Sequence, residues 1–194
     1  MKKNLLLLAF VGILFAFAPA ADVYKVDLSK SKIEWIGAKV TGKHNGEIKL
    51  ASGVLNAKGN KLDGGNFEMD MTSMTCIDLD ASNGNKLLGH LKSDDFFSVE
   101  KNPTSKFVIT KVQNTGVDKA TITGNLTIKG ITNAISFPAS IKQKDGVLVA
   151  VANGVKINRT KFDIKYGSKS FIDGLGDKAI DDEFTLNITL LAKK

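Results

Sequence analysis

The sequence predicts an all-β protein: a closed antiparallel β-barrel of about eight strands with a short helical insertion. Three observations support this fold class. Apolar and polar residues alternate along most of the chain, short turn signals separate the alternating runs, and only one stretch has a helical pattern. Alternation places one face of each strand on an apolar interior and the other in water. Because few helices are available to cover the apolar face, we expect the sheet to close on itself, which also removes its exposed edges.

The first 20 residues have the order of a secretory signal peptide. Lys2 and Lys3 form a basic start, residues 5–17 are an uncharged apolar run, and Ala18-Pro19-Ala20 is a small-x-small site. The run is short for a membrane span, which takes about 20 apolar residues. The alternative is an uncleaved N-terminal anchor. We expect export, cleavage after Ala20, and a single domain over residues 21–194.

The alternating runs define the strands in chain order. Their apolar members are Ile33 and Trp35; Phe67, Met69 and Met71; Phe107 and Ile109; Ile122, Leu126 and Ile128; Ile135, Phe137 and Ile141; and Phe184, Leu186, Ile188 and Leu190. The turn signals between them are Asn45-Gly46, Lys58-Gly59-Asn60, Asp63-Gly64-Gly65, Asn114-Thr115-Gly116, Lys129-Gly130 and Asp145-Gly146. Connections this short make antiparallel hairpins, because a parallel crossover needs a dozen residues or more.

Residues 77–100 depart from this alternation. Leu87, Leu88 and Leu91 have the spacing of one helical face. Ser93 is expected to cap a second short helix, with Asp94 and Asp95 in its first turn. We expect this insertion to lie across one end of the barrel as a lid or plug. The polar loop of residues 165–178 is too long for a hairpin turn and is expected beside the same mouth.

Composition and charge narrow the classes of function. Cys76 is the only cysteine, so no internal disulfide forms, and its apolar neighbours predict a buried, unreactive thiol. The net charge of +7 falls to +5 without Lys2 and Lys3, and Arg159 is the only arginine. Because the basic residues are scattered singly, we expect no nucleic-acid partner. Such a surface suits transient contact with anionic lipid headgroups, by a monomer or a homodimer.

Residues that could carry chemistry are sparse. His44, His90 and Cys76 lie far apart without the spacing of a metal site, so we expect none. The segment from Asp78 to Asn83 resembles a calcium loop only faintly, since the closing glutamate is missing, and a solvated turn is expected. Asp181-Asp182-Glu183 is interpreted as the exposed start of a strand, and no nucleophile motif is present. We therefore expect no catalytic residues.

Two alternatives remain open from the residues alone. The inward apolar stripes can fill a core or line a cavity, since an eight-stranded barrel can hold one small ligand. Flexible methionines at 69 and 71, and the glycines Gly37 and Gly124 within stripes, favour a cavity. His90 can be a structural residue that fastens the insertion, or a polar contact at the end of a ligand tunnel.

Several segments resemble the YceI-like family over essentially the whole chain from residue 22 to residue 192. They are Val26-Asp27 with Ser31-Lys32-Ile33; Gly89-His90-Leu91-Lys92-Ser93-Asp94-Asp95-Phe96-Phe97 followed by Asn102-Pro103 and Phe107; Gly124-Asn125-Leu126-Thr127-Ile128-Lys129-Gly130-Ile131-Thr132; Asn158-Arg159-Thr160-Lys161-Phe162; and Asp182-Glu183-Phe184-Thr185-Leu186. Residues 35–44 depart from the family's usual opening, and Asn158 stands where an aspartate is common. These departures put the contacts to a ligand's headgroup in doubt more than the fold.

The resemblance implies a lipocalin-like barrel in the periplasm that binds a polyisoprenoid, such as the tail of an isoprenoid quinone, and that is not an enzyme. No cofactor is required, and the bound isoprenoid lipid or quinone is the expected ligand. The predicted binding residues are Trp35, Phe67, Met69, Met71, His90, Phe96, Phe107, Ile109, Phe137 and Phe184. The alternatives are a protein-interaction module with a filled core and a stress-related enzyme that acts on a lipid.

Overall fold

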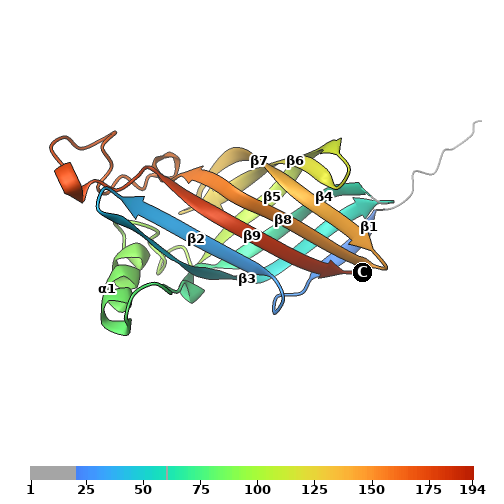
Figure 1. Cartoon of the computed structure of the whole chain (residues 1–194), viewed down its shortest axis with the longest axis horizontal. Coiled ribbons are helices and arrows are strands. Elements are labelled where there is room, and N and C mark those ends of the chain that lie inside the picture. Colours follow the sequence, from blue (N-terminus) through green and yellow to red (C-terminus); the bar gives the residue numbers. More distant parts are fainter. Residues whose placement is uncertain (1–20, 60) are drawn as a thin grey trace, which may run out of the picture.

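The computed structural model describes residues 21–59 and 61–194, so the predicted signal peptide lies outside the described residues. Strands dominate this part of the chain (Figure 1). They are β1 (Asp22–Val26), β2 (Lys32–Lys39), β3 (Gly42–Lys58), β4 (Lys61–Asp70), β5 (Thr104–Gly116), β6 (Lys119–Ile128), β7 (Ile131–Lys144), β8 (Val147–Asn158) and β9 (Glu183–Lys193). One α-helix, α1 (Ala81–Lys92), and the short 3₁₀ helices η1 (Met71–Ser73), η2 (Arg159–Phe162) and η3 (Gly176–Lys178) complete the described elements.

The strands form a closed antiparallel barrel, which confirms the predicted fold class. Eight of them follow one another around the ring as β3-β2-β9-β8-β7-β6-β5-β4, and β4 pairs back onto β3. The ninth, β1, pairs with the last part of β3 and with the end of β9. The barrel is elongated, with α1 and the loop of residues 165–178 at one end (Figure 1). We call this end the mouth and the loop of residues 165–178 the mouth loop.

The turn chemistry explains some hairpins and not others. Lys129-Gly130 and Asp145-Gly146 both have positive φ angles and join β6 to β7 and β7 to β8, as two-residue hairpin turns require. The prediction of turns at Asn45-Gly46 and Asp63-Gly64-Gly65 was wrong, because these residues lie within β3 and β4. A Cβ on Gly46 would stand 1.8 Å from the carbonyl oxygen of Thr75. That glycine therefore lets another segment cross the strand closely.

The helical insertion was predicted correctly in its first part only. Asp80 caps α1 by accepting hydrogen bonds from the backbone N–H groups of Ser82 and Asn83, both at 3.0 Å. The predicted second helix does not form. Ser93 instead ends α1, because its hydroxyl and its N–H both donate to the carbonyl of His90. Among the described helices, none is long and apolar enough to cross a membrane.

Large inward side chains fill part of the barrel and leave part of it open. The rings of Phe67, Phe107 and Phe137 follow one another across β4, β5 and β7, with centroids 6.5 Å and 5.7 Å apart. Gly124 does not leave empty space as expected, since a Cβ there would lie 2.4 Å from Cζ of Phe107. Gly37 does, because no atom lies within 4 Å of its Cβ position.

Candidate functional site

A cavity of about 270 Å³ runs inside the barrel. Its wall is built from the inward positions of β2 to β9, with α1 and the segment after it at the mouth. Along its length the wall is almost entirely aliphatic, aromatic and methionine side chains, including Leu55 and Leu62 far from the mouth. A deep apolar cavity with a few polar groups at one end is the usual form of a site for a small apolar ligand.

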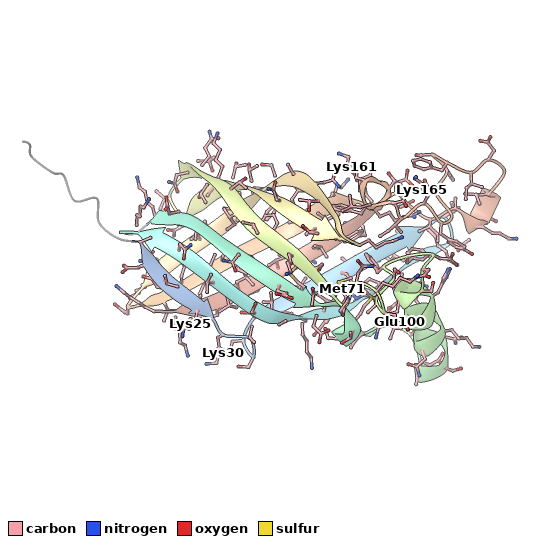
Figure 2. The ribbon with its side chains drawn as sticks, turned by 180° about the vertical axis from the view of Figure 1, so that it is seen from behind. Lys25, Lys30, Met71, Glu100, Lys161 and Lys165 are labelled. Atoms are coloured by element: carbon pink, nitrogen blue, oxygen red, sulfur yellow. The ribbon has the colours of Figure 1, made fainter. Side chains whose placement is uncertain are left out.

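The structure places all ten predicted binding residues in the wall of this cavity. Those on strands could be predicted from the period-two alternation, because every second side chain of a pleated strand points into the barrel. Met71 lies past the end of β4, in η1, and is reached through a turn in which Asp70 accepts a hydrogen bond from the N–H of Thr72. Figure 2 shows Met71 at the same end of the barrel as α1. That these residues hold a ligand remains a prediction.

Polar residues of the wall gather at the mouth. His44, His90, Arg159, Asp181 and Glu183 all line the cavity there. His90 on α1 makes edge-to-face contacts with Phe96 and with Tyr166 of the mouth loop, at centroid distances of 4.9 Å and 4.6 Å. His90 therefore joins α1 to the mouth loop and also lines the cavity. Its position is compatible both with a structural role and with a contact to a ligand.

Arg159 is buried beneath this aromatic group. Its side chain is 3% exposed, and its guanidinium carbon lies 5.7 Å from the centroid of the Phe96 ring. Nε, Nη1 and Nη2 donate to the carbonyls of Asp181, Ile164 and Ile180 at 2.9, 2.8 and 3.0 Å. The planar fork of an arginine is suited to holding several backbone oxygens at once. Arg159 thus fastens both ends of the mouth loop to the barrel.

Asp182 is the charge partner of Arg159. Its Oδ1 is buried without a hydrogen-bond partner and lies 3.8 Å from Nη2 of Arg159. Burial raises the pKa of Asp182, but hydrogen bonds from Ser168 and Ser170 and the charge of Arg159 outweigh it, and the pKa lies below its usual range. The interpretation of Asp181-Asp182-Glu183 as an exposed strand start was therefore wrong for Asp182, whose side chain is 22% exposed.

The segment before α1 is anchored by Asp78. Its carboxylate accepts from the N–H of Asn45 at 3.0 Å and pairs with Nδ1 of His44 at 2.9 Å. Cys76 donates to the same carboxylate, and burial raises the pKa of this half-buried thiol. Burial raises the pKa of Asp78 as well, but the hydrogen bonds from Asn45, His44 and Cys76 prevail and lower it to about 2. Asp78 and Asp80 therefore serve as an anchor and a helix cap.

We expect Asp78→Asn to lower the free energy of unfolding in a pH-dependent way. A carboxylate with a depressed pKa stabilises the folded state above its unfolded pKa, near 3.8, and the effect is lost as the pH falls towards 2. The loss at neutral pH should be at most about 2 to 3 kcal/mol, since each pKa unit corresponds to about 1.4 kcal/mol. Urea unfolding of both proteins from pH 6 to pH 2 measures the difference, which should shrink below pH 4. A constant difference would show that the carboxylate's charge is not what anchors the segment.

Several wall residues were not singled out from the sequence. From the sequence, Arg159 was noted only as the single arginine and as part of a motif. His44 was noted only as a histidine without the spacing of a metal site and within a departure from the family pattern. The buried environment of Arg159 has no signature in alternation, because it comes from η2 and a loop. Asn158 stands where the family commonly has an aspartate, but it still caps η2. Its Oδ1 accepts hydrogen bonds from the N–H and the hydroxyl of Thr160. Among the described residues, no group of three His, Cys, Asp or Glu side chains is arranged to hold a metal ion.

Solved structures share this fold at low sequence identity. BcnA from Burkholderia cenocepacia aligns with a TM-score of 0.71 at 22% identity, over 87% of this chain and 99% of its own. A polyisoprenoid binding domain from Saccharophagus degradans aligns at 0.65 and 12% identity, over 88% and 97%. The YCEI protein of Campylobacter jejuni aligns at 0.55 and 18% identity, over 100% and 99%.

Sequence comparisons extend the likeness. UPF0312 proteins of Pseudomonas aeruginosa strain LESB58 and Pseudomonas putida strain W619 are 48% identical over 52 residues and 45% identical over 51 residues. Each match spans 27% of the relative's length and about a quarter of this chain, at 27% and 26%. The model of the YceI-like domain matches residues 24–192. The chain therefore belongs to the YceI-like family.

Proposed function

We propose that the protein binds a long apolar isoprenoid, such as the tail of an isoprenoid quinone, inside its barrel and carries or stores it in the periplasm. The observation that carries the proposal is the cavity, whose wall is apolar along its length and polar only at the mouth. A ligand with an apolar tail and one polar end matches this distribution. Binding such a ligand needs no cofactor and no catalytic group.

The energetics of burial favour such a ligand. Each Å² of apolar surface removed from water contributes roughly 25 cal/mol, so a long tail gains on the order of 10 kcal/mol before the costs of association. The flexible thioethers of Met69, Met71 and Met74 lie in the wall and can adapt to a branched chain. The polyisoprenoid binding domain of Saccharophagus degradans, which has the same fold, supports the ligand class.

The polar groups at the mouth are already engaged in holding the structure, which favours binding over catalysis. Arg159 donates to three backbone carbonyls, and His90 packs between two aromatic rings and lies 3.4 Å from Asp95. Because the barrel encloses a cavity, the alternative of a protein-interaction module with a filled core is less favoured.

The mouth loop supports brief contact with a membrane, where the ligand is exchanged. Its apolar side chains are unusually exposed, with Phe171 54% and Tyr166 46% accessible. Lys165 lies 5.1 Å from the centroid of the Phe171 ring, so an apolar tip and a positive charge occur together. Aromatic rings beside lysines suit the headgroup region of a bilayer.

We expect the protein purified from its own periplasm to carry isoprenoid. Native mass spectrometry should show a complex with one ligand per chain, and organic extraction should release a polyisoprenoid that can be identified. A ligand returned unchanged after incubation agrees with a carrier, whereas a chemically altered one would indicate an enzyme. A ligand-free mass, together with no uptake of added isoprenoid quinone, would contradict the proposal.

A further inference from the structure

The backbone ladder between β7 and β8 stops halfway along the barrel. It joins Ser140 to Val151 and continues to Lys144 and Val147, at the end opposite the mouth. Residues 131–139 of β7 pair only with β6, and β8 beyond Val151 pairs only with β9. In the described chain no backbone hydrogen bond joins these two stretches. At 3.3 Å per residue, the unpaired stretch is about 30 Å long on β7 and about 23 Å long on β8. In Figure 1 the hairpin that joins β7 to β8 lies beside the C-terminus, at the end of the barrel opposite the mouth.

The sequence contains features that keep this seam unpaired. The two-residue turn at Asp145-Gly146 sets Lys144 opposite Val147 as a hydrogen-bonded pair, so the even-numbered residues of β7 direct their backbone groups towards β8. Pro138 is one of these and has no N–H to donate. On β8, the register shifts between Ala152 and Val155, and the N–H of Gly154 donates to Oδ1 of Asn187 on β9. A bulge and a proline are common means of preventing strand edges from pairing.

The cavity reaches the seam from inside. Ile135, Phe137 and Ala139 on β7 line it, as do Ala150, Ala152 and Val155 on β8. Val151 also lines it, although its partner on β9 is the exposed Thr189, which places Val151 on the outer side of the sheet. Val151 is the last residue of β8 that pairs with β7, so the cavity wall reaches the point where the seam begins.

Several side-chain contacts link the segments that surround the mouth. The rings of His90, Phe96 and Tyr166 are packed together over Arg159. Nζ of Lys92 at the end of α1 donates to the carbonyl of Thr72 at 2.8 Å. A long tail threaded end-on would have to pass these groups along its whole length. A slot in the wall beside the mouth lets the tail move sideways while its polar end stays at the mouth.

We propose that the seam between β7 and β8 is a lateral opening through which the apolar tail enters and leaves the barrel. The inference rests on the proposed function, since it assumes a long apolar ligand. The partner on the outside is the apolar layer of a bilayer that holds the ligand. The exposed residues Ala134, Ser136 and Gly154 along the seam are small. At its mouth end the seam is bridged by one hydrogen bond, from Nδ2 of Asn133 on β7 to the carbonyl of Lys161 after β8 at 2.9 Å, and this bond must open for the tail to pass.

A covalent link across the seam tests this route. Ser136→Cys and Lys156→Cys, both at exposed positions, are joined by a short bis-maleimide in a Cys76→Ser background. The matched control carries Val108→Cys and Asn125→Cys, exposed partners across the fully paired β5–β6 seam. Trp35 is the only tryptophan and lines the cavity, so a bound quinone quenches its fluorescence. The probe is an isoprenoid quinone in phosphatidylcholine vesicles, and mass spectrometry confirms each link.

Linking the β7–β8 seam should slow quinone uptake roughly tenfold or more, because the remaining route has a higher barrier. Linking the control seam should leave the rate as in the unlinked protein. Equal rates in all three proteins, with normal uptake, overturn the lateral opening and leave the proposed function standing. An unlinked protein that takes up no quinone overturns both.

Discussion

Met69→Lys should abolish ligand retention while the barrel remains folded. Met69 is 8% exposed and points into the cavity from β4, between Leu50 on β3 and Ser105 on β5. An ammonium group there must stay hydrated, and a bound apolar tail would remove that water. An unpaired charge buried in this way costs several kcal/mol, and 3 kcal/mol corresponds to roughly a 150-fold weaker Kd. Titration with an isoprenoid quinone, followed by Trp35 fluorescence, measures the change.

Two control variants separate the effect of the cavity from general effects. Asn66→Lys places the same charge on the exposed outer face of the same strand and should bind normally. Met69→Leu keeps the volume and the apolar character, and should change affinity little. Circular dichroism should show the same strand content for all three. If Met69→Lys retains native amounts of lipid, the ligand does not occupy this part of the cavity.

The fold could be predicted because alternation and closure follow from short-range chemistry. Phe67 and Met69 on β4, and Phe184 and Leu186 on β9, have the parity that the alternation indicates. The errors occurred where tertiary contacts decide. Gly46 resembles a turn residue, but it serves the close approach of Thr75. The space at Gly124 is taken by Phe107 from the neighbouring strand, which local sequence cannot reveal.

The candidate site divides in the same way. The strand part of its apolar wall could be predicted, because the pleat decides which strand side chains point inward. Met71 and Phe96 line the cavity from outside the strands. Its mouth could not, because Arg159, Asp182 and Tyr166 meet through η2 and the mouth loop, which have no period. The seam between β7 and β8 was equally hidden. Pro138 and Gly154 are visible in the sequence, but only the register shows that they face the same gap.

Arg159→Leu should lower the free energy of unfolding by about 3–5 kcal/mol, the usual cost of removing one member of a buried ion pair. The change leaves the carbonyls of Ile164, Ile180 and Asp181 without their donor and leaves the Asp182 carboxylate without its countercharge. This is a large share of a typical domain stability of about 5–15 kcal/mol. Urea unfolding followed by circular dichroism measures it. Release of the mouth loop should also make Lys165 and Lys169 more accessible to proteases.

Two further variants show whether the charge or the hydrogen-bond geometry dominates. Arg159→Lys keeps the charge but cannot hold three carbonyls, so it should recover little of the lost stability. Arg159→Met combined with Asp182→Leu removes both charges and should be more stable than Arg159→Met alone, because the stranded carboxylate is the costly group. If the double variant loses as much stability as the two single changes added together, Asp182 is not coupled to Arg159. The mouth would then be held by the backbone hydrogen bonds of the arginine alone.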